Sequence, residues 1–169
     1  MHVSKIKKPL VLSVLFFLPV LFLLFLYPSK HNYETLDIVQ TNIPELYNFK
    51  TLDGDSIQLE GHLSVVGFLG NSPMDDATFA LNLKELIYDK FLGFKRFQVL
   101  ALVPYSAEQQ VLDLNKELNA FVPLQYWKFA FGTEQAIKEA YTNFKITRPL
   151  KLNLSSNHVF VCLLYTSDA

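Results

Sequence analysis

Apolar residues follow two different patterns along this chain, one continuous and one periodic. The continuous run covers residues 9–27, which include no charged residue and only one weakly polar one, Ser13. At about 1.5 Å per residue a helix of this length crosses a hydrocarbon layer of about 30 Å. The run therefore predicts one transmembrane helix. Because lysines crowd residues 1–8, the positive-inside rule places that end in the cytoplasm and the rest of the chain beyond the membrane.

A cleavable signal peptide is the main alternative to an uncleaved anchor. Its apolar region usually has about 7–15 residues and ends in a small-x-small cleavage site. Residues 25–30, where the run ends, contain no such site, so we expect an uncleaved anchor. A buried core helix is disfavoured because no polar stripe interrupts the apolar run.

The periodic patterns begin after a polar stalk at residues 28–42. Residues 43–49 and 56–59 alternate apolar and polar side chains, and an Asp-Gly-Asp turn at residues 53–55 separates them. This pattern predicts a β-hairpin.

Short apolar runs then alternate with amphipathic segments. Strands are predicted at 63–69, 97–103, 125–131 and 157–163, and helices through 77–91, 111–118 and 136–144. We expect Asp75 or Asp76 to cap the first of these helices, Ser106 the second and Thr133 the third. The order predicts an α/β fold, a three-layer sandwich whose sheet is at least partly parallel.

Composition and charge narrow the function classes. The chain has 169 residues, which allows one globular domain plus a short appendage, and 15 Lys+Arg balance 16 Asp+Glu. No long block of like charge suggests nucleic-acid binding, and we interpret the basic residues as solvated surface rather than a phosphate-binding face. The single cysteine, Cys162, forms no intramolecular disulfide, so the domain depends on its core alone.

Several segments follow one another in an informative order. They are residues 43–46 and 53–54, the Ser72-Pro73 loop after an apolar strand, residues 99–104, and residues 131–134 before a helix. In this order they resemble the SCO/SenC family of membrane-anchored, thioredoxin-like copper proteins that help assemble cytochrome c oxidase. The resemblance covers roughly residues 40–161 and depends on the order of elements more than on identities. It implies a thioredoxin-like fold after the N-terminal anchor.

The resemblance also implies where a metal site would lie. The family binds copper through a cysteine pair in the strand-to-helix loop and a histidine before a later strand. These positions fall on Ser72, Asp76 and a residue near Ser155. Copper(I) prefers thiolate ligands, and a hydroxyl and a carboxylate cannot exchange disulfides. We therefore expect a degenerate metal site, no cofactor and no thiol redox chemistry.

Other chemistry at this loop has weaker support. Met74 and Asp75 with His158 are an alternative ligand set of thioether, carboxylate and imidazole, although both loop aspartates also suit a helix cap and His158 suits a strand start. Ser72 as a nucleophile would need a base, and only carboxylates lie nearby in sequence without a G-x-S-x-G motif. We expect no catalytic residue and no enzyme activity.

The chain end bears on how complete the fold is. Residues 162–169 resemble translated sequencing-adapter sequence, so we expect a domain at 43–161, a doubtful tail, and a truncated reading frame that lacks the last strand and helix. The alternative is a genuine short variant with an exposed sheet edge.

The sequence favours one function over two others. The favoured one is a non-catalytic, inner-membrane SCO-like protein, with its soluble domain on the periplasmic side and a protein partner in respiratory oxidase assembly. The first alternative is a chaperone that handles copper or another metal through non-cysteine ligands. The second is a thioredoxin-like peroxidase, which the missing loop cysteines argue against.

Overall fold

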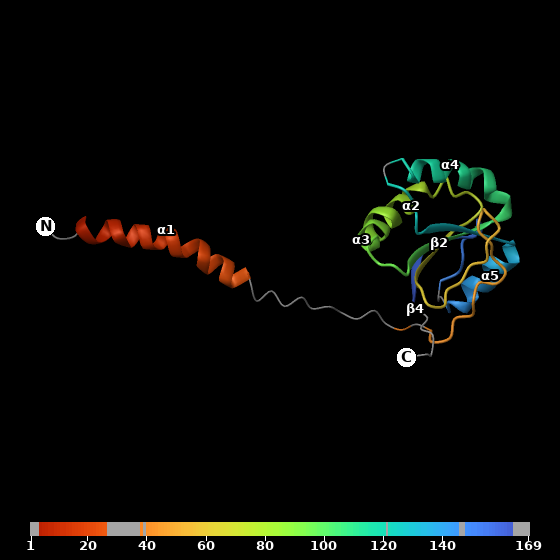
Figure 1. The fold of residues 1–169 in the computed structure, drawn as a ribbon, viewed down its shortest axis with the longest axis horizontal. Coiled ribbons are helices and arrows are strands. Elements are labelled where there is room, and N and C mark those ends of the chain that lie inside the picture. Colours follow the sequence, from red (N-terminus) through yellow and green to blue (C-terminus); the bar gives the residue numbers. More distant parts are fainter. Residues whose placement is uncertain (1–3, 27–37, 39, 121, 146–147, 164–169) are drawn as a thin grey trace. The chain divides into compact units, whose positions relative to one another are not determined.

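A computed structural model describes residues 4–26, 38, 40–120, 122–145 and 148–163 (Figure 1). It separates into two units, residues 1–37 and 38–169. Most of the predicted stalk and the tail from residue 164 lie outside the described residues.

The first unit contains one helix, α1 (Ser4–Leu26). Its segment Lys8–Phe25 is long and apolar enough to cross a membrane, and none of that segment is buried, unlike the core helix of a soluble protein. The predicted apolar helix is therefore confirmed. It begins five residues before the predicted span, and Tyr27 lies outside the described residues.

The second unit is built on a four-stranded sheet in the order β3-β2-β1-β4. The strands β1 (Leu63–Leu69), β2 (Phe97–Pro104) and β3 (Trp127–Gly132) are parallel, whereas β4 (Ser155–Leu163) is antiparallel to β1. The bounds of each strand agree within two residues with those of a predicted apolar run. The prediction of a partly parallel α/β sheet is confirmed.

Helices cover both faces of this sheet. On one face lie α2 (Ala77–Leu83), the π-helical turn η1 (Lys84–Tyr88) and α3 (Asp89–Phe91), which follow one another directly, and then α4 (Glu108–Leu118) after a 3-10 turn. On the other face lies α5 (Glu134–Asn143). Figure 1 shows α5 apart from α2 and α4, with the sheet between them.

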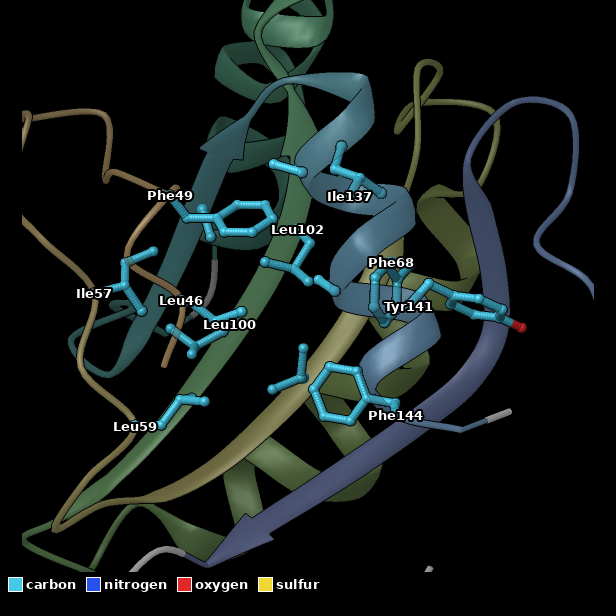
Figure 2. Packing of buried hydrophobic residues seen from close by; sticks show 14 of the residues in the cluster. Leu46, Phe49, Ile57, Leu59, Phe68, Leu100, Leu102, Ile137, Tyr141 and Phe144 are labelled. Atoms are coloured by element: carbon cyan, nitrogen blue, oxygen red, sulfur yellow. The ribbon is translucent and has the colours of Figure 1, made fainter. Parts of the chain in front are cut away.

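Each face has its own hydrophobic core. The α5 core joins that helix to the sheet and to the segment that enters the domain, and it contains residues that Figure 2 labels: Leu46, Phe49, Ile57, Leu59, Phe68, Leu100, Leu102, Ile137, Tyr141 and Phe144. The second core lies under α2 and α4 and includes the only tryptophan, Trp127, which is 6% exposed.

Of the predicted hairpin over residues 43–59, only the turn forms, because neither arm is a strand. An antiparallel bridge between Lys50 and Ser56 closes the turn, and Lys50 also pairs with Phe131 of β3 through hydrogen bonds of 3.0 and 2.8 Å. The carboxylate of Glu45 accepts hydrogen bonds from the backbone nitrogens of Leu59 and Glu60, both at 2.7 Å. The segment forms a cover over the α5 core because Leu46, Phe49, Ile57 and Leu59 belong to that core, whereas Tyr47 is exposed.

Of the three predicted helix caps, Thr133 is confirmed, Asp76 occupies the cap position without the expected hydrogen bond, and Ser106 is wrong. A capping side chain reaches back to its helix from an extended backbone. Thr133 has that backbone, and its hydroxyl accepts from the nitrogen of Ala136 at 3.1 Å. Asp76 (φ −96°, ψ 19°) caps its helix with no side-chain hydrogen bond, and Ala107 rather than Ser106 occupies the cap of α4.

Candidate functional site

The loop of residues 70–76, which follows β1, is fixed against the turn before β4. Gly70 has a φ of +68°, and a β-carbon there would overlap the backbone at Asn153 and Ser155. The backbone nitrogen of Asn71 donates to the carbonyl of Asn153 at 2.8 Å. The chain leaves β1 in close contact with residues 153–155.

Ser155 begins β4 opposite Leu69, the last residue of β1. Its side chain is buried, and its hydroxyl donates to Oδ1 of Asn153 at 2.9 Å, an oxygen that also accepts from the nitrogen of Ser155 at 3.2 Å. The structure therefore places Ser155 beside the start of the loop that contains Ser72. This hydroxyl is engaged in holding the turn.

The other loop residues differ in exposure. Ser72, Met74 and Asp76 are half-buried, whereas Asp75 is exposed. The backbone nitrogen of Asp75 donates to the carbonyl of Ser72 at 3.0 Å, which makes the loop a tight turn. Met74 packs against the core under α2 and α4, which accounts for its half-buried side chain.

Two buried oxygens in this loop lack a hydrogen-bond donor among the described residues. They are Oδ1 of Asn71 and Oδ2 of Asp76. Buried acceptors of this kind normally bond to protein or to ordered water. Together with the hydroxyl of Ser72 they give the loop hard oxygen donors.

This donor set does not fit copper(I). Soft thiolate or thioether ligands select that ion, and the three positions that correspond to the family's ligands are Ser72, Asp76 and Ser155, all oxygen donors. Within the described part of the chain, no three His, Cys, Asp or Glu side chains gather as metal ligands. His158, in the alternative set, is half-buried in β4, where its backbone nitrogen donates to the hydroxyl of Ser156 at 3.1 Å.

Cys162 lies in the α5 core, in β4 opposite Ser64 of β1. It is 2% exposed, and burial raises the pKa of its thiol from 9.0 to about 12. Because the thiolate is the reactive form, this residue is a packing residue at neutral pH.

The thiol makes stability depend on pH above 9. The unfolded chain releases the proton near pH 9.0, whereas the folded chain holds it until about pH 12, so this contribution is complete below pH 9 and is lost between pH 9 and 12. We expect the free energy of unfolding to fall between pH 9 and 11 by about 2 kcal/mol more in the native chain than in Cys162→Ala. Urea unfolding followed by circular dichroism at each pH measures the two slopes. Equal slopes would contradict the burial of the thiol.

Sequence reasoning missed a buried ion pair on the α2 face. Lys84 is 6% exposed, and its Nζ lies 3.6 Å from Oδ1 of Asp89. The pair spans five residues, the spacing of a π-helical turn rather than of an α-helix. Nearby, the hydroxyl of Tyr88 donates to the carbonyl of Pro123 and accepts from the nitrogen of Tyr126, both at 3.2 Å. These contacts fix the helix rather than the loop of residues 70–76.

Sequence reasoning also missed the residues that lock the loop, Gly70, Asn71 and Asn153. A glycine directly after an apolar strand was the only local signal, and it names no partner.

Comparison with known proteins identifies the fold. No protein-family model and no curated protein matches this sequence. Among solved structures, a protein from Aquifex aeolicus VF5 described as a candidate electron transfer protein aligns with a TM-score of 0.51 and 14% identity over 76% of this chain and 88% of its own. At that identity the likeness shows the fold alone. The domain has a thioredoxin-like fold, with a four-stranded sheet flanked by helices.

A second solved structure is BsSco, a member of the Sco family of cytochrome c oxidase assembly proteins in which a disulfide switch was identified. It aligns with a TM-score of 0.39 and 20% identity over 64% of this chain and 69% of its own.

Proposed function

We propose that this chain is a membrane-anchored SCO-like protein that acts through protein contacts, without catalysis, in the assembly of a respiratory cytochrome oxidase. The order of sequence segments that resembles the SCO/SenC family supports the family and the process. The apolar helix α1 supports an anchor in the inner membrane, with the domain on the periplasmic side.

The observation that carries the non-catalytic part is the chemistry of the loop of residues 70–76. Thioredoxin-fold proteins use thiols where the first strand meets its helix, and this loop has oxygen donors there, including Ser72 and Asp76. The one thiol of the chain, Cys162, is buried in the α5 core. Neither thiol exchange nor copper(I) binding has the ligands that it needs at this loop.

A contact surface for a partner protein is expected at the same edge of the sheet. The carboxyl ends of the parallel strands β1 and β2 lie at that edge, so the loop of residues 70–76 and the turn that begins at Tyr105 follow neighbouring strands. Tyr105, in that turn, is 50% exposed while its ring stacks on Phe131 at 6.2 Å. A rigid, half-exposed aromatic residue is the kind that carries binding energy in protein interfaces.

A second candidate function is the handling of a metal other than through cysteines. The unpartnered oxygens of Asn71 and Asp76 favour it, because a cation would satisfy them. Met74, Asp75 and His158 would supply the remaining ligands.

Titration with copper(I) against a chromogenic chelator separates the proposed function from the copper-handling form of the second candidate, in which Met74 and His158 bind the ion. The full chain in neutral detergent is expected to leave the chelator's copper untouched. A Ser72→Cys and Asp76→Cys double variant, kept reduced, is the positive control, since it restores two thiolates on the same scaffold. One equivalent bound tightly by the native chain, and lost in Met74→Ser or His158→Ala, would overturn the proposal in favour of the second candidate.

Cellular complementation tests the assembly role. A strain without this gene is expected to contain less assembled cytochrome oxidase, and a Ser72→Ala copy is expected to restore it fully. A Tyr105→Ala copy should restore it only in part, because the aromatic contact is lost. Unchanged oxidase in the deletion strain would refute the assembly role, and failure of Ser72→Ala alone would refute the absence of chemistry at the loop.

A further inference from the structure

A groove of about 630 Å³ lies beside the C-terminal end of α5. Its lining residues are far in sequence from the loop of residues 70–76. Three cationic side chains line it: Lys138 from the helix, and Lys145 and Arg148 from the segment that follows. Among the described residues that line it, none is a carboxylate. The sequence alone suggests solvated surface for such residues, but folding gathers these three around one hollow.

The three cations have no counter-ion in the described part of the chain. All three are exposed, and no acidic side chain of the described residues lies within 4.0 Å of them. A cation at the end of a helix interacts favourably with the helix dipole, which accounts for Lys145. That effect fades beyond the last turn and does not account for Lys138, which lies five residues before the last residue of α5. Three like charges around one groove repel one another unless an anion joins them.

The walls of the groove are held in place by the core. Tyr141 is 6% exposed, with its ring in edge contact with Phe68 at 5.1 Å, and its hydroxyl donates to the carbonyl of Arg148 at 2.9 Å. Figure 2 shows this hydroxyl at the outer end of the side chain, away from the leucines of the core. Lys145 has a left-handed backbone, with a φ of 49°, which turns the chain at the helix end. The charged side chains are therefore mounted on a preformed frame.

We propose that this groove binds a phosphate group. A guanidinium matches phosphate oxygens with two parallel hydrogen bonds, and the two ammonium groups add charge-assisted contacts to the same anion. The phosphate has two sources of the same chemistry, a free phosphate compound or the headgroup of an anionic phospholipid.

Calorimetric titration of the full chain in neutral detergent with inorganic phosphate tests the proposal. The groove variant is Lys138→Gln, Lys145→Gln and Arg148→Gln. The matched control changes Lys90, Lys95 and Arg96 to glutamine, which removes the same charge from exposed positions outside the groove. We expect saturable binding by the native chain, weakened at least about tenfold in the groove variant and less than about twofold in the control. Unfolding followed by Trp127 fluorescence verifies that both variants fold.

Two further titrants identify the source of the phosphate. Tighter binding of short-chain phosphatidylglycerol than of inorganic phosphate supports a lipid headgroup, provided that short-chain phosphatidylcholine binds no better, and the reverse order supports a free phosphate compound. Arg148→Lys, which keeps the charge and loses the two-pronged contact, is expected to weaken both. Absence of saturation up to about 10 mM phosphate, a range that covers even weak sites, would overturn the proposal. Equal losses in the two triple variants, or tighter binding of an oligoglutamate peptide than of either phosphate probe, would also overturn it.

Discussion

Replacement of Gly70 by alanine is expected to lower the free energy of unfolding by about 3–5 kcal/mol. The added β-carbon meets backbone atoms of residues 153–155, which cannot move aside as a flexible side chain would, and the nitrogen of Ser155 lies only 2.7 Å away. The positive φ of 68° adds backbone strain for any residue with a β-carbon. Urea unfolding followed by the fluorescence of Trp127 measures the loss.

A matched variant separates steric overlap from backbone strain. Gly54 has a φ of +87°, and a β-carbon there would meet nothing within 4 Å. Gly54→Ala is therefore expected to cost only the strain, about 1–2 kcal/mol. Equal losses in the two variants would contradict the close contact between the loop of residues 70–76 and the turn before β4.

Replacement of Phe68 by alanine is the second large change, with an expected loss of about 3–5 kcal/mol. Phe68 is fully buried at the centre of the α5 core, and its ring makes edge contacts with Tyr141 at 5.1 Å, Phe144 at 6.0 Å and Phe160 at 6.1 Å. These rings come from α5 and β4, so the variant leaves a cavity where three elements meet (Figure 2). A lower urea midpoint in the same unfolding experiment measures this loss of stability.

Phe94→Ala provides the comparison. This ring is 57% exposed and follows α3, outside both cores, so its removal is expected to cost less than about 1 kcal/mol. A loss as large as that of Phe68→Ala would mean that ring area alone, rather than position in the core, determines the effect.

The sheet could be predicted from the sequence because its central strands, β1 and β2, are short, mainly apolar runs buried on both faces. All eight side chains of β2 are buried, and Gln98 is the one polar residue in its sequence. Helix α5 followed from the same logic, since its apolar residues recur at helical spacing and Thr133 has the residue type and backbone of a cap.

Alternation alone could not distinguish a strand from a cover. Residues 43–59 place apolar side chains on one side, as a half-buried strand does, but Lys50 finds its backbone partner in Phe131, 81 positions later. A local pattern contains no information on that partner. The errors at Asp76 and Ser106 have a similar origin. A residue of a capping type lies at or next to each cap position, but the turns before the helices set the backbone angles there.

The sequence could suggest where the candidate site lies, but not the contacts that build it. The resemblance pointed to Ser72, Asp76 and Ser155, and the fold does join the loop after β1 to the start of β4. The contact that joins them is made by Gly70 and Asn153, mostly through backbone atoms. Backbone contacts between distant segments leave little trace in residue types. The proposed phosphate groove likewise depends on a turn at Lys145 that no sequence pattern predicts.

The pairing of Lys50 with Phe131 bears on the order in which the domain is made. The cover formed by residues 43–59 is synthesised first, yet its partners in β3 and α5 emerge only after most of the domain has been translated. Closing so long a loop is slow and brings no stabilisation until its far end arrives. While the chain is being synthesised, Leu46, Phe49, Ile57 and Leu59 therefore remain without their cluster. During this interval the protein is most accessible to a chaperone or a protease.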